Sequence, residues 1–172
     1  MSESFRRRLR ALPDFPDLMP DFDPEKAAAD PAVLFRAWLE DAVAAGVPQP
    51  HACSLATADA GGNLSSRMLI LKNLDDDGWH FATARTSRKG RELAANPRAA
   101  MNFYWPQVGR QVRLAGTVVE LSATASAADW ADRPAADGTA NPQWQLYALR
   151  PSEIEFWQAR ADRRHIRHRY VL

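Results

Sequence analysis

The sequence predicts a mainly β fold with flanking helices, in which short antiparallel strands form a closed or nearly closed barrel. After His51, apolar runs of strand length alternate with turn signals such as Gly61-Gly62 and the Asp75–Gly78 stretch. Helical spacing of apolar residues is confined to a few segments. The 172 residues are enough for one domain with a real core. We therefore expect an irregular N-terminal arm over residues 1–30 and a single domain over residues 31–172.

The arm is predicted to be irregular because it carries four prolines among acidic residues. Asp30 and Pro31 then suit the cap and the first position of a helix, and Gly46 suits its end. Between them Leu34 and Trp38 fall at helical spacing. A helix is therefore predicted from about residue 31 to 45.

A strand hairpin follows, with Ser54–Thr57 and Ser66–Lys72 on either side of the glycine turn. The Asp75–Gly78 turn leads into a strand at Trp79–Thr83. A short helix capped by Ser87 is predicted to run to about Ala95. The remaining predicted elements are strands at 99–105 and 111–121, a helix at 121–133, and strands at 146–149, 154–157 and 167–171.

The composition argues against several classes of protein. A net charge of +1 is unusual for a dedicated nucleic-acid binder, although arginines gather at both ends of the chain. The single cysteine, Cys53, excludes an intrachain disulfide and fits a reducing cytoplasm. No secretory signal is visible, and no apolar run approaches the roughly 18 residues of a membrane span. No phosphate loop, dinucleotide-binding glycine motif or serine elbow is present. We expect a cytoplasmic protein with neither a membrane nor a nucleic acid as partner.

Two stretches in the middle of the chain combine cations with apolar residues. Arg67 and Lys72 lie at the two ends of an apolar centre, and on a strand they project to opposite faces. Arg88 and Lys89 follow Ser87 at a helix start, where free N–H groups bind phosphate and added cations oppose the helix dipole. The alternatives are a core strand bracketed by charges and an exposed basic helix.

A third group lies near the C-terminus, where Trp157 precedes the basic residues Arg163, Arg164, His165, Arg167 and His168. The two histidines are three residues apart but lack accompanying thiols or carboxylates, so we expect no metal site. The charges alone are typical of a solvated face or a nucleic-acid patch. Their nearness to Trp157 favours a pocket for an anionic aromatic ligand.

Four stretches in order carry a family resemblance: Arg67–Lys72, Thr86–Leu93, Phe103–Pro106 with Arg110–Val112, and Ile154–Gln158 with the basic residues after it. From about residue 30 to Tyr170 the chain resembles the flavin-dependent pyridoxine/pyridoxamine 5'-phosphate oxidases. The resemblance implies an FMN-binding split β-barrel that forms a homodimer with FMN at the subunit interface. It also implies hydride transfer from an amine- or alcohol-bearing carbon to FMN, which O2 reoxidises with release of hydrogen peroxide.

The same resemblance implies roles for individual residues. The implied flavin contacts are Arg67, Met68, Leu69, Ile70, Leu71, Lys72, Ala82, Thr83, Arg88, Lys89 and Gln111, joined by Gln143, Trp144, Trp157 and Arg167. These two groups are expected to come from opposite subunits. The implied substrate side consists of Lys72, Arg133, Arg163 and His165, of which Arg163 and His165 are the catalytic candidates.

The sequence departs from the family where a substrate phosphate is held. Asp129 and Asp137 stand where tyrosine and serine are usual, and Trp144 replaces another serine. Two carboxylates beside a phosphate would repel it by about 1 kcal/mol per charge pair at 4 Å even in water. Trp130 and the stretch Phe15-Pro16-Asp17 resemble the phenazine-biosynthesis branch. The family default is oxidation of pyridoxamine or pyridoxine 5'-phosphate in pyridoxal phosphate biosynthesis. The alternatives are a flavin oxidase of an unphosphorylated aromatic metabolite and an FMN-binding module without turnover.

Overall fold

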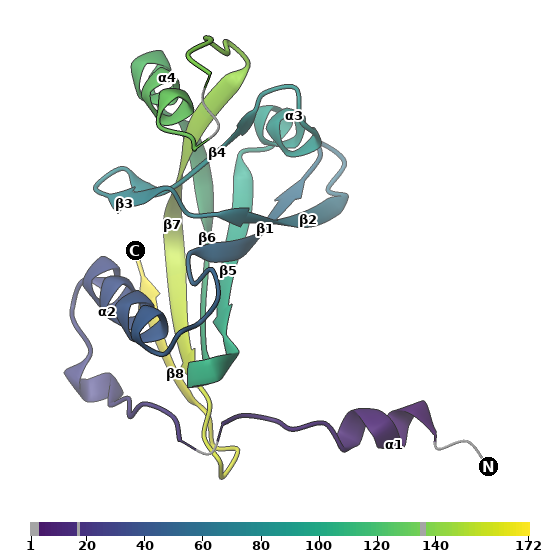
Figure 1. Ribbon diagram of the computed structural model, residues 1–172, viewed down its shortest axis with the longest axis vertical. Coiled ribbons are helices and arrows are strands. Elements are labelled where there is room, and N and C mark those ends of the chain that lie inside the picture. The colour runs from purple at the N-terminus through teal and green to yellow at the C-terminus, as the bar shows by residue number, and fades with distance from the viewer. Residues whose placement is uncertain (1–3, 17, 135–136) are drawn as a thin grey trace.

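The computed structural model describes residues 4–16, 18–134 and 137–172, so Asp17 lies outside the described residues. One antiparallel sheet of eight strands curls into a half barrel, with helices at its ends and side (Figure 1). The mainly β class with flanking helices is confirmed, and the curled sheet is that of a split barrel. No helix in the described ranges is long and apolar enough to cross a bilayer.

The elements follow one another in a simple order. The helices are α1 (Phe5–Arg10), α2 (Pro31–Ala44), α3 (Arg88–Ala95) and α4 (Ala123–Ala131), with short 3-10 helices η1 (Pro24–Lys26) and η2 (Pro106–Val108). The strands are β1 (Ala52–Ala58), β2 (Leu64–Ile70), β3 (Asn73–Asp75), β4 (Gly78–Ala84), β5 (Arg98–Trp105), β6 (Arg110–Glu120), β7 (Trp144–Gln158) and β8 (Ile166–Val171). The three helices predicted after residue 30 are therefore confirmed.

Strand β7 pairs with β4, β6 and β8, and its length shows that one prediction was wrong. The strands are ordered β2-β1-β5-β6-β7-β4-β3, and β8 pairs with β7. The two strands predicted at 146–149 and 154–157 are one 15-residue strand. Pro151, which has no N–H, is accommodated at a bulge where the β6 register shifts between Ala115 and Gly116. A side chain at Gly116 would lie 2.0 Å from Arg150 O, so only glycine allows this close approach.

The predicted turn at Asp75–Gly78 is confirmed. Asp75 pairs directly with Gly78, so β3 and β4 form a hairpin with a two-residue loop. The arm differs from the prediction, because it contains α1 and η1. Ser4 caps α1 through its side chain, and Asp23 caps η1 in the same way. These side-chain caps stabilise short helical turns that a proline-rich composition obscured.

Helix α2 closes the open side of the curled sheet and forms the core with it. Phe35 and Trp38 on α2 are buried, and their rings meet Phe103 at 4.9 Å and Phe156 at 5.1 Å. Arg110, at the start of β6, is 2% exposed and stacks 4.3 Å from the Trp38 ring. This helix therefore fixes the lower end of β6 and β7 in Figure 1. Helices α3 and α4 lie at the opposite end.

Candidate functional site

The start of α3 is a tightly built helix N-terminus. Ser87 Oγ accepts a hydrogen bond from Gly90 N at 3.1 Å and lies 3.1 Å from Thr83 Oγ1. A side chain at Gly90 would lie 2.5 Å from Arg85 O, so the helix packs directly on the end of β4. Burial lowers the pKa of Lys89, and the nearby Arg67 charge lowers it further. Two neighbouring cations at a helix N-terminus are unfavourable alone and favourable with an anion between them.

Arg67 points inward from β2, because the alternation of the strand turns residues 65, 67 and 69 toward the sheet interior. Its Nη1 donates to Leu55 O at 3.2 Å and Thr57 Oγ1 at 2.6 Å. Its Nη2 donates to Ser65 Oγ at 2.5 Å and Glu92 Oε2 at 3.2 Å. Both Nη groups are therefore engaged within the protein, which leaves the Nε–H as the donor for a ligand.

Glu92 on α3 is a site residue that sequence reasoning missed. It is 5% exposed and accepts hydrogen bonds from the Thr57 and Ser65 hydroxyls, Arg88 Nε at 2.7 Å and Arg67. These bonds lower the pKa of Glu92 from 4.5 to about 2. The two hydroxyls make the largest contributions, and Arg88 and Arg67 make smaller ones. A fixed carboxylate thus holds two of the predicted flavin contacts, Arg67 and Arg88, together. Glu92 follows Arg88 by four residues, a spacing that brings two side chains together on a helix, so the sequence contained a signal for this pair.

The apolar stretch from Met68 to Leu71 was predicted as the centre of a strand, and the structure shows that it is not fully buried. Met68 is 68% exposed and Ile70 is 40% exposed, whereas Leu69 and Leu71 are half-buried. Met68 and Ile70 project to the outer face of the sheet, where apolar side chains can contact a flat ligand or another chain. On β4, Ala82 is half-buried and Thr83 is buried beside Ser87.

A second group of predicted flavin contacts forms a row across three strands. Gln111 on β6 pairs with Trp157 on β7, and Trp157 pairs with Arg167 on β8. Opposed residues of an antiparallel pair share a face, so the three side chains lie side by side. Tyr104 extends the row, because it pairs with Gln111 and is exposed. Sequence reasoning noted Tyr104 only within an aromatic stretch, since its direction depends on the strand register.

The structure changes the expected grouping of these contacts. Gln111 was grouped with Arg67, but it lies with Trp157 at the end of β7 opposite Trp144. Gln143 and Trp144 instead lie near the start of α3, where Gln143 O accepts a bond from Arg85 N at 2.7 Å. At about 3.3 Å per residue, Trp144 and Trp157 are roughly 40 Å apart along the strand. The predicted flavin contacts of one chain thus form two candidate half-sites at opposite ends of β7, a strand whose course is seen in Figure 1.

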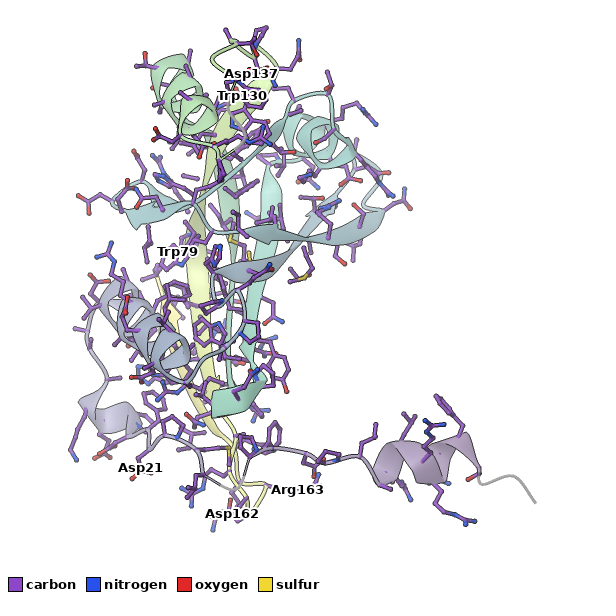
Figure 2. All side chains as sticks on the ribbon, viewed as in Figure 1. Asp21, Trp79, Trp130, Asp137, Asp162 and Arg163 are labelled. Carbon is purple, nitrogen blue, oxygen red and sulfur yellow. The ribbon has the colours of Figure 1, made fainter. Side chains whose placement is uncertain are left out.

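The catalytic candidates Arg163 and His165 lie beside the row. The His165 ring is 4.8 Å from that of Trp157, and its Nδ1 accepts a bond from Arg160 N at 3.1 Å. Phe15 of the arm packs on both rings, at 5.6 Å from Trp157 and 5.7 Å from His165. Arg163 is exposed and paired with Asp14, at the loop tip shown in Figure 2. The structure therefore brings these residues together with Trp157 and the N-terminal arm.

The remaining substrate candidates lie at the other end of the sheet. Lys72 Nζ is 3.6 Å from Asp129 Oδ1, and Asp129 Oδ2 accepts a bond from Trp144 Nε1 at 2.7 Å. Asp137 is not among the residues that line the cavity containing Lys72 and Asp129. It instead accepts bonds from Thr139 N at 2.9 Å and Thr139 Oγ1 at 2.6 Å within its own turn. Of the two aspartates that depart from the family pattern, Asp129 is therefore the one that pairs with Lys72, and Asp137 is engaged by its own turn.

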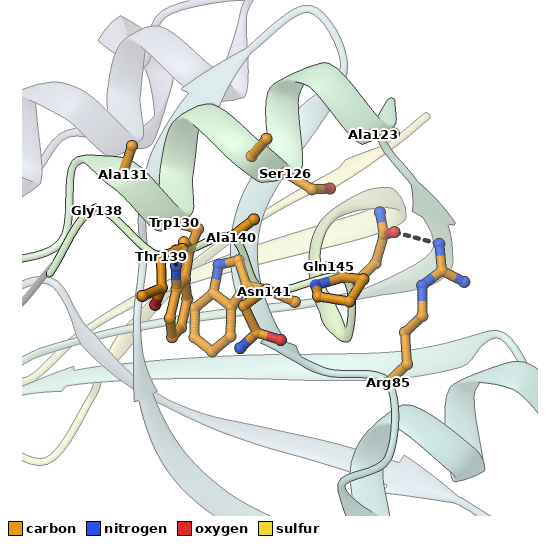
Figure 3. Close-up of a pocket in the computed structure, with 13 residues that line it drawn as sticks. Arg85, Ala123, Ser126, Trp130, Ala131, Gly138, Thr139, Ala140, Asn141 and Gln145 are labelled. Atoms are coloured by element: carbon orange, nitrogen blue, oxygen red, sulfur yellow. Dashed lines mark hydrogen bonds between the residues drawn. The ribbon is translucent and has the colours of Figure 1, made fainter.

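Two cavities flank α4. One of about 480 Å³ lies between α4 and the β3–β4 hairpin and includes Lys72 and Asp129. The other, of about 640 Å³, has Trp130 on one wall and Gln145 and Arg85 on the opposite one (Figure 3). Both volumes lie in the range of small-molecule sites. Of the predicted substrate residues, Lys72 lines the smaller cavity.

Comparisons with known proteins agree with this architecture. Residues 39–158 match the family model described as pyridoxamine 5'-phosphate oxidase. The chain belongs to the pyridoxamine 5'-phosphate oxidase family. The pyridoxine/pyridoxamine 5'-phosphate oxidase of Cupriavidus taiwanensis is 39% identical over 84% of each chain. That of Bordetella pertussis is 38% identical over 85% of each.

A solved structure of the phenazine branch is also similar. PhzG from Burkholderia lata, in complex with tetrahydrophenazine-1-carboxylic acid, is 30% identical with a TM-score of 0.82. The similarity covers 93% of this chain and 94% of PhzG. Family membership makes this chain an FMN-dependent oxidoreductase with a split-barrel fold.

The residue types of the two candidate half-sites together fit FMN. Lys89 and Arg88 stand at a helix N-terminus, where a phosphate would relieve the repulsion between Lys89 and Arg67. The exposed apolar side chains of Met68 and Ile70 suit the face of a ring system. The row of Tyr104, Gln111 and Trp157 adds aromatic faces and an amide donor. These residue types match the two ends of the cofactor, the phosphate and the flavin ring.

Proposed function

We propose that this protein is an FMN-dependent oxidase whose substrate is an unphosphorylated aromatic or dihydroaromatic metabolite. The observation that carries the proposal is the ion pair between Lys72 and Asp129. Lys72 is one of the cations that the family resemblance assigns to the substrate, and here a carboxylate of the same chain already compensates it. Asp129 is 13% exposed in its side chain, so solvent screens this pair less than a surface pair.

The proposed reaction removes two electrons and two hydrogens from the substrate and delivers them to O2, which becomes hydrogen peroxide. FMN supplies the hydride-accepting ring and the route of electrons to oxygen. The protein's part is to orient the donor carbon and to hold charge near it. Arg163 and His165 are the candidates for this role because they border Trp157 at the flavin half-site. With Nδ1 accepting from Arg160 N, a neutral His165 carries its proton on Nε2.

We infer that the functional unit is a homodimer. Two half-sites separated by the length of β7 cannot hold one cofactor, but a second copy can bring the opposite ends together. The outer face of the sheet supports this, because it exposes Met68, Ile70 and Tyr104. On the same face, Asn102 Oδ1 is buried without a hydrogen-bond partner in the described chain. A symmetric partner would cover these groups and complete two equivalent sites.

Oxidation of pyridoxamine or pyridoxine 5'-phosphate is the second candidate. The curated relatives at 38–39% identity carry that name, and Lys72, Arg133, Arg163 and His165 are all present. In this reading the protein serves pyridoxal phosphate synthesis in the cytoplasm, where a buried free thiol such as Cys53 stays reduced. The compensated Lys72 argues against it.

Anaerobic reduction of the bound flavin tests the proposal. The FMN-loaded protein is mixed with pyridoxamine 5'-phosphate, pyridoxine 5'-phosphate and unphosphorylated dihydroaromatic amines, alcohols and carboxylates. We expect bleaching by an unphosphorylated reductant, followed by one peroxide per turnover in air. Efficient bleaching by pyridoxamine 5'-phosphate alone would contradict the proposal, and no bleaching by any reductant would favour a binding module.

A matched pair of variants isolates the ion pair. Asp129→Asn keeps an acceptor for Trp144 Nε1 but releases Lys72, so it should lower the KM for pyridoxamine 5'-phosphate. Asp137→Asn is the control, because among the described residues its carboxylate bonds to Thr139 in its own turn and not to Lys72. If the two variants behave alike, the Lys72–Asp129 pair does not set substrate choice.

A further inference from the structure

Helix α1 exposes an apolar stripe that is bordered by arginines. At about 3.6 residues per turn, Phe5, Leu9 and Leu12 fall on one face, and they are 73%, 51% and 56% exposed. Arg8 lies on one side of this stripe, and Arg6 lies on the other. The helix extends away from the sheet in Figure 1, and none of its residues is buried. Such a face suits a surface that combines apolar groups with carboxylates.

The cavity between α4 and the β3–β4 hairpin has that combination, and we call it the acidic cleft. Its volume is about 480 Å³. The apolar side chains in its wall are those of Leu121, Ala125, Ala128 and Leu146. The carboxylates in its wall are those of Asp75 and Asp77 on the hairpin, Asp129 on α4 and Asp132 just after α4.

The acidic cleft keeps negative charge after its own ion pairs are counted. Asp129 pairs with Lys72 at 3.6 Å. Asp77 pairs with Arg150 at 2.9 Å. Asp132 is exposed and has no ion pair among the described residues. Because ion pairs at an exposed surface are individually weak, arginines docked here would set the orientation, and burial of the apolar stripe would supply most of the binding.

The acidic cleft of the same chain is out of reach of α1. Phe15 is anchored on the Trp157 ring at 5.6 Å, and Leu9 precedes it by six residues, a span of at most about 20 Å. Leu146 of the cleft lies roughly 36 Å from Trp157 along β7. In the homodimer inferred above, the Trp157 end of one chain meets the end of the second copy that carries Lys72. Since Lys72 also lines the cleft, the cleft of the second copy comes within reach.

We propose that α1 of each chain docks in the acidic cleft of a second copy of the chain, with Leu9 toward its apolar wall and the arginines toward its aspartates. The inference rests on the homodimer of the proposed function and adds a contact that the sheet face does not make. Because a two-fold dimer is reciprocal, the two copies make this contact twice. The arm is then held by Phe15 on its own chain and by α1 on the second copy.

Cross-linking of the FMN-loaded protein with a short bismaleimide tests this docking. Leu9→Cys with Ala128→Cys places one thiol on the stripe and one in the wall of the acidic cleft. Cys53 does not compete, because burial raises its pKa to about 12. We expect a product with the mass of two chains. Leu9→Cys with Ala37→Cys is the control, because Ala37 is an exposed alanine on α2, at the other end of the sheet, and should give no such product.

Charge variants of the thiol-bearing protein then test the complementarity. Arg8→Glu with Arg10→Glu should lower the cross-linking rate about tenfold, because two exposed ion pairs are replaced by repulsions. Asp132→Lys with Asp76→Lys at the exposed hairpin tip should have the same effect. Combining all four changes should restore the rate to within about threefold, since contacting residues are not additive. Losses that simply add in the combined variant would refute the contact.

The remaining outcomes separate the docking from the proposed function. A cross-link within one chain, or no cross-link in a protein that sediments as a dimer, would overturn the docking and leave the homodimer. Sedimentation as a flavin-loaded monomer would overturn both. If the dimer gives no cross-linked product but co-sediments with vesicles of phosphatidylserine and phosphatidylcholine, the stripe belongs to a membrane surface and the docking is wrong.

Discussion

Replacing Lys89 by methionine should separate the cofactor phosphate from the rest of the flavin site. Lys89 is half-buried in the first turn of α3, and no carboxylate of the described chain pairs with it. Loss of one charged hydrogen bond of this kind corresponds to about 2 kcal/mol, or roughly 30-fold in Kd. Riboflavin has the same ring without the phosphate, so its affinity should not change.

The folded protein should not become less stable in this variant. The charge of Arg67 opposes that of Lys89, so removing Lys89 relieves a repulsion in the cofactor-free state. The expected result is therefore weaker FMN binding with an unchanged or higher Tm. Lys26→Met is the control, because Lys26 pairs with Asp23 in η1 and should leave both affinities unaltered.

The assay is fluorescence titration of the cofactor-free protein with FMN and with riboflavin. A parallel loss of both affinities would show that Lys89 supports the fold of the site and does not contact the phosphate. A change of less than about threefold for FMN would refute the assignment outright. Arg67→Ala is not an equivalent test, because both Nη groups of Arg67 hold β1, β2 and α3 together.

Three further predictions follow from individual contacts. Arg110→Ala should lower the free energy of unfolding, measured by urea denaturation, by about 3 kcal/mol, because it leaves Gln158 Oε1 without its donor and removes the ion pair with Asp41. The pKa of Glu92 falls from 4.5 to about 2, so its stabilisation is complete above pH 4.5 and is lost as the pH falls toward 2. Tm measured over this range should decline less steeply in Glu92→Gln than in the wild type. Met68→Glu on the exposed sheet face should produce monomers in sedimentation experiments, and a flavin-loaded wild-type monomer at micromolar concentration would argue against the dimer.

The local signals in the sequence were sufficient for most of the fold. Caps at Asp30 and Ser87 and the alternation of strands after His51 depend on neighbours along the chain, and the structure has these elements where they were predicted. Strand β7 was split because Pro151 reads as an interruption. Its continuity depends on the bulge opposite Gly116, about 35 positions earlier in the chain, which no local pattern shows.

The site was predictable as a set of residue types but not as a geometry. The charged and aromatic residues were recognised, yet the partners of Arg67, which are Thr57, Ser65 and Glu92, lie on three different elements and could not be read from the sequence. The grouping of Gln111 was wrong because it depends on the pairing of β6 with β7. The turn made by Asp137 with Thr139 was local, and an aspartate two residues before a threonine could have indicated it.

Charge compensation distinguishes the two places where this family resemblance implies phosphate binding. At the cofactor half-site, Lys89 lies beside a second cation without a carboxylate of its own, a cost that an incoming phosphate offsets. At the substrate side, Lys72 is neutralised by Asp129. The same kind of residue is thus left available at one site and engaged at the other. If charge compensation sets ligand choice, a phosphate group should strengthen cofactor binding markedly. At the substrate side, a phosphate group should strengthen binding only slightly or weaken it. The contrast between FMN and riboflavin in cofactor binding, and between pyridoxamine 5'-phosphate and unphosphorylated reductants in flavin bleaching, measures both halves of that difference in one protein.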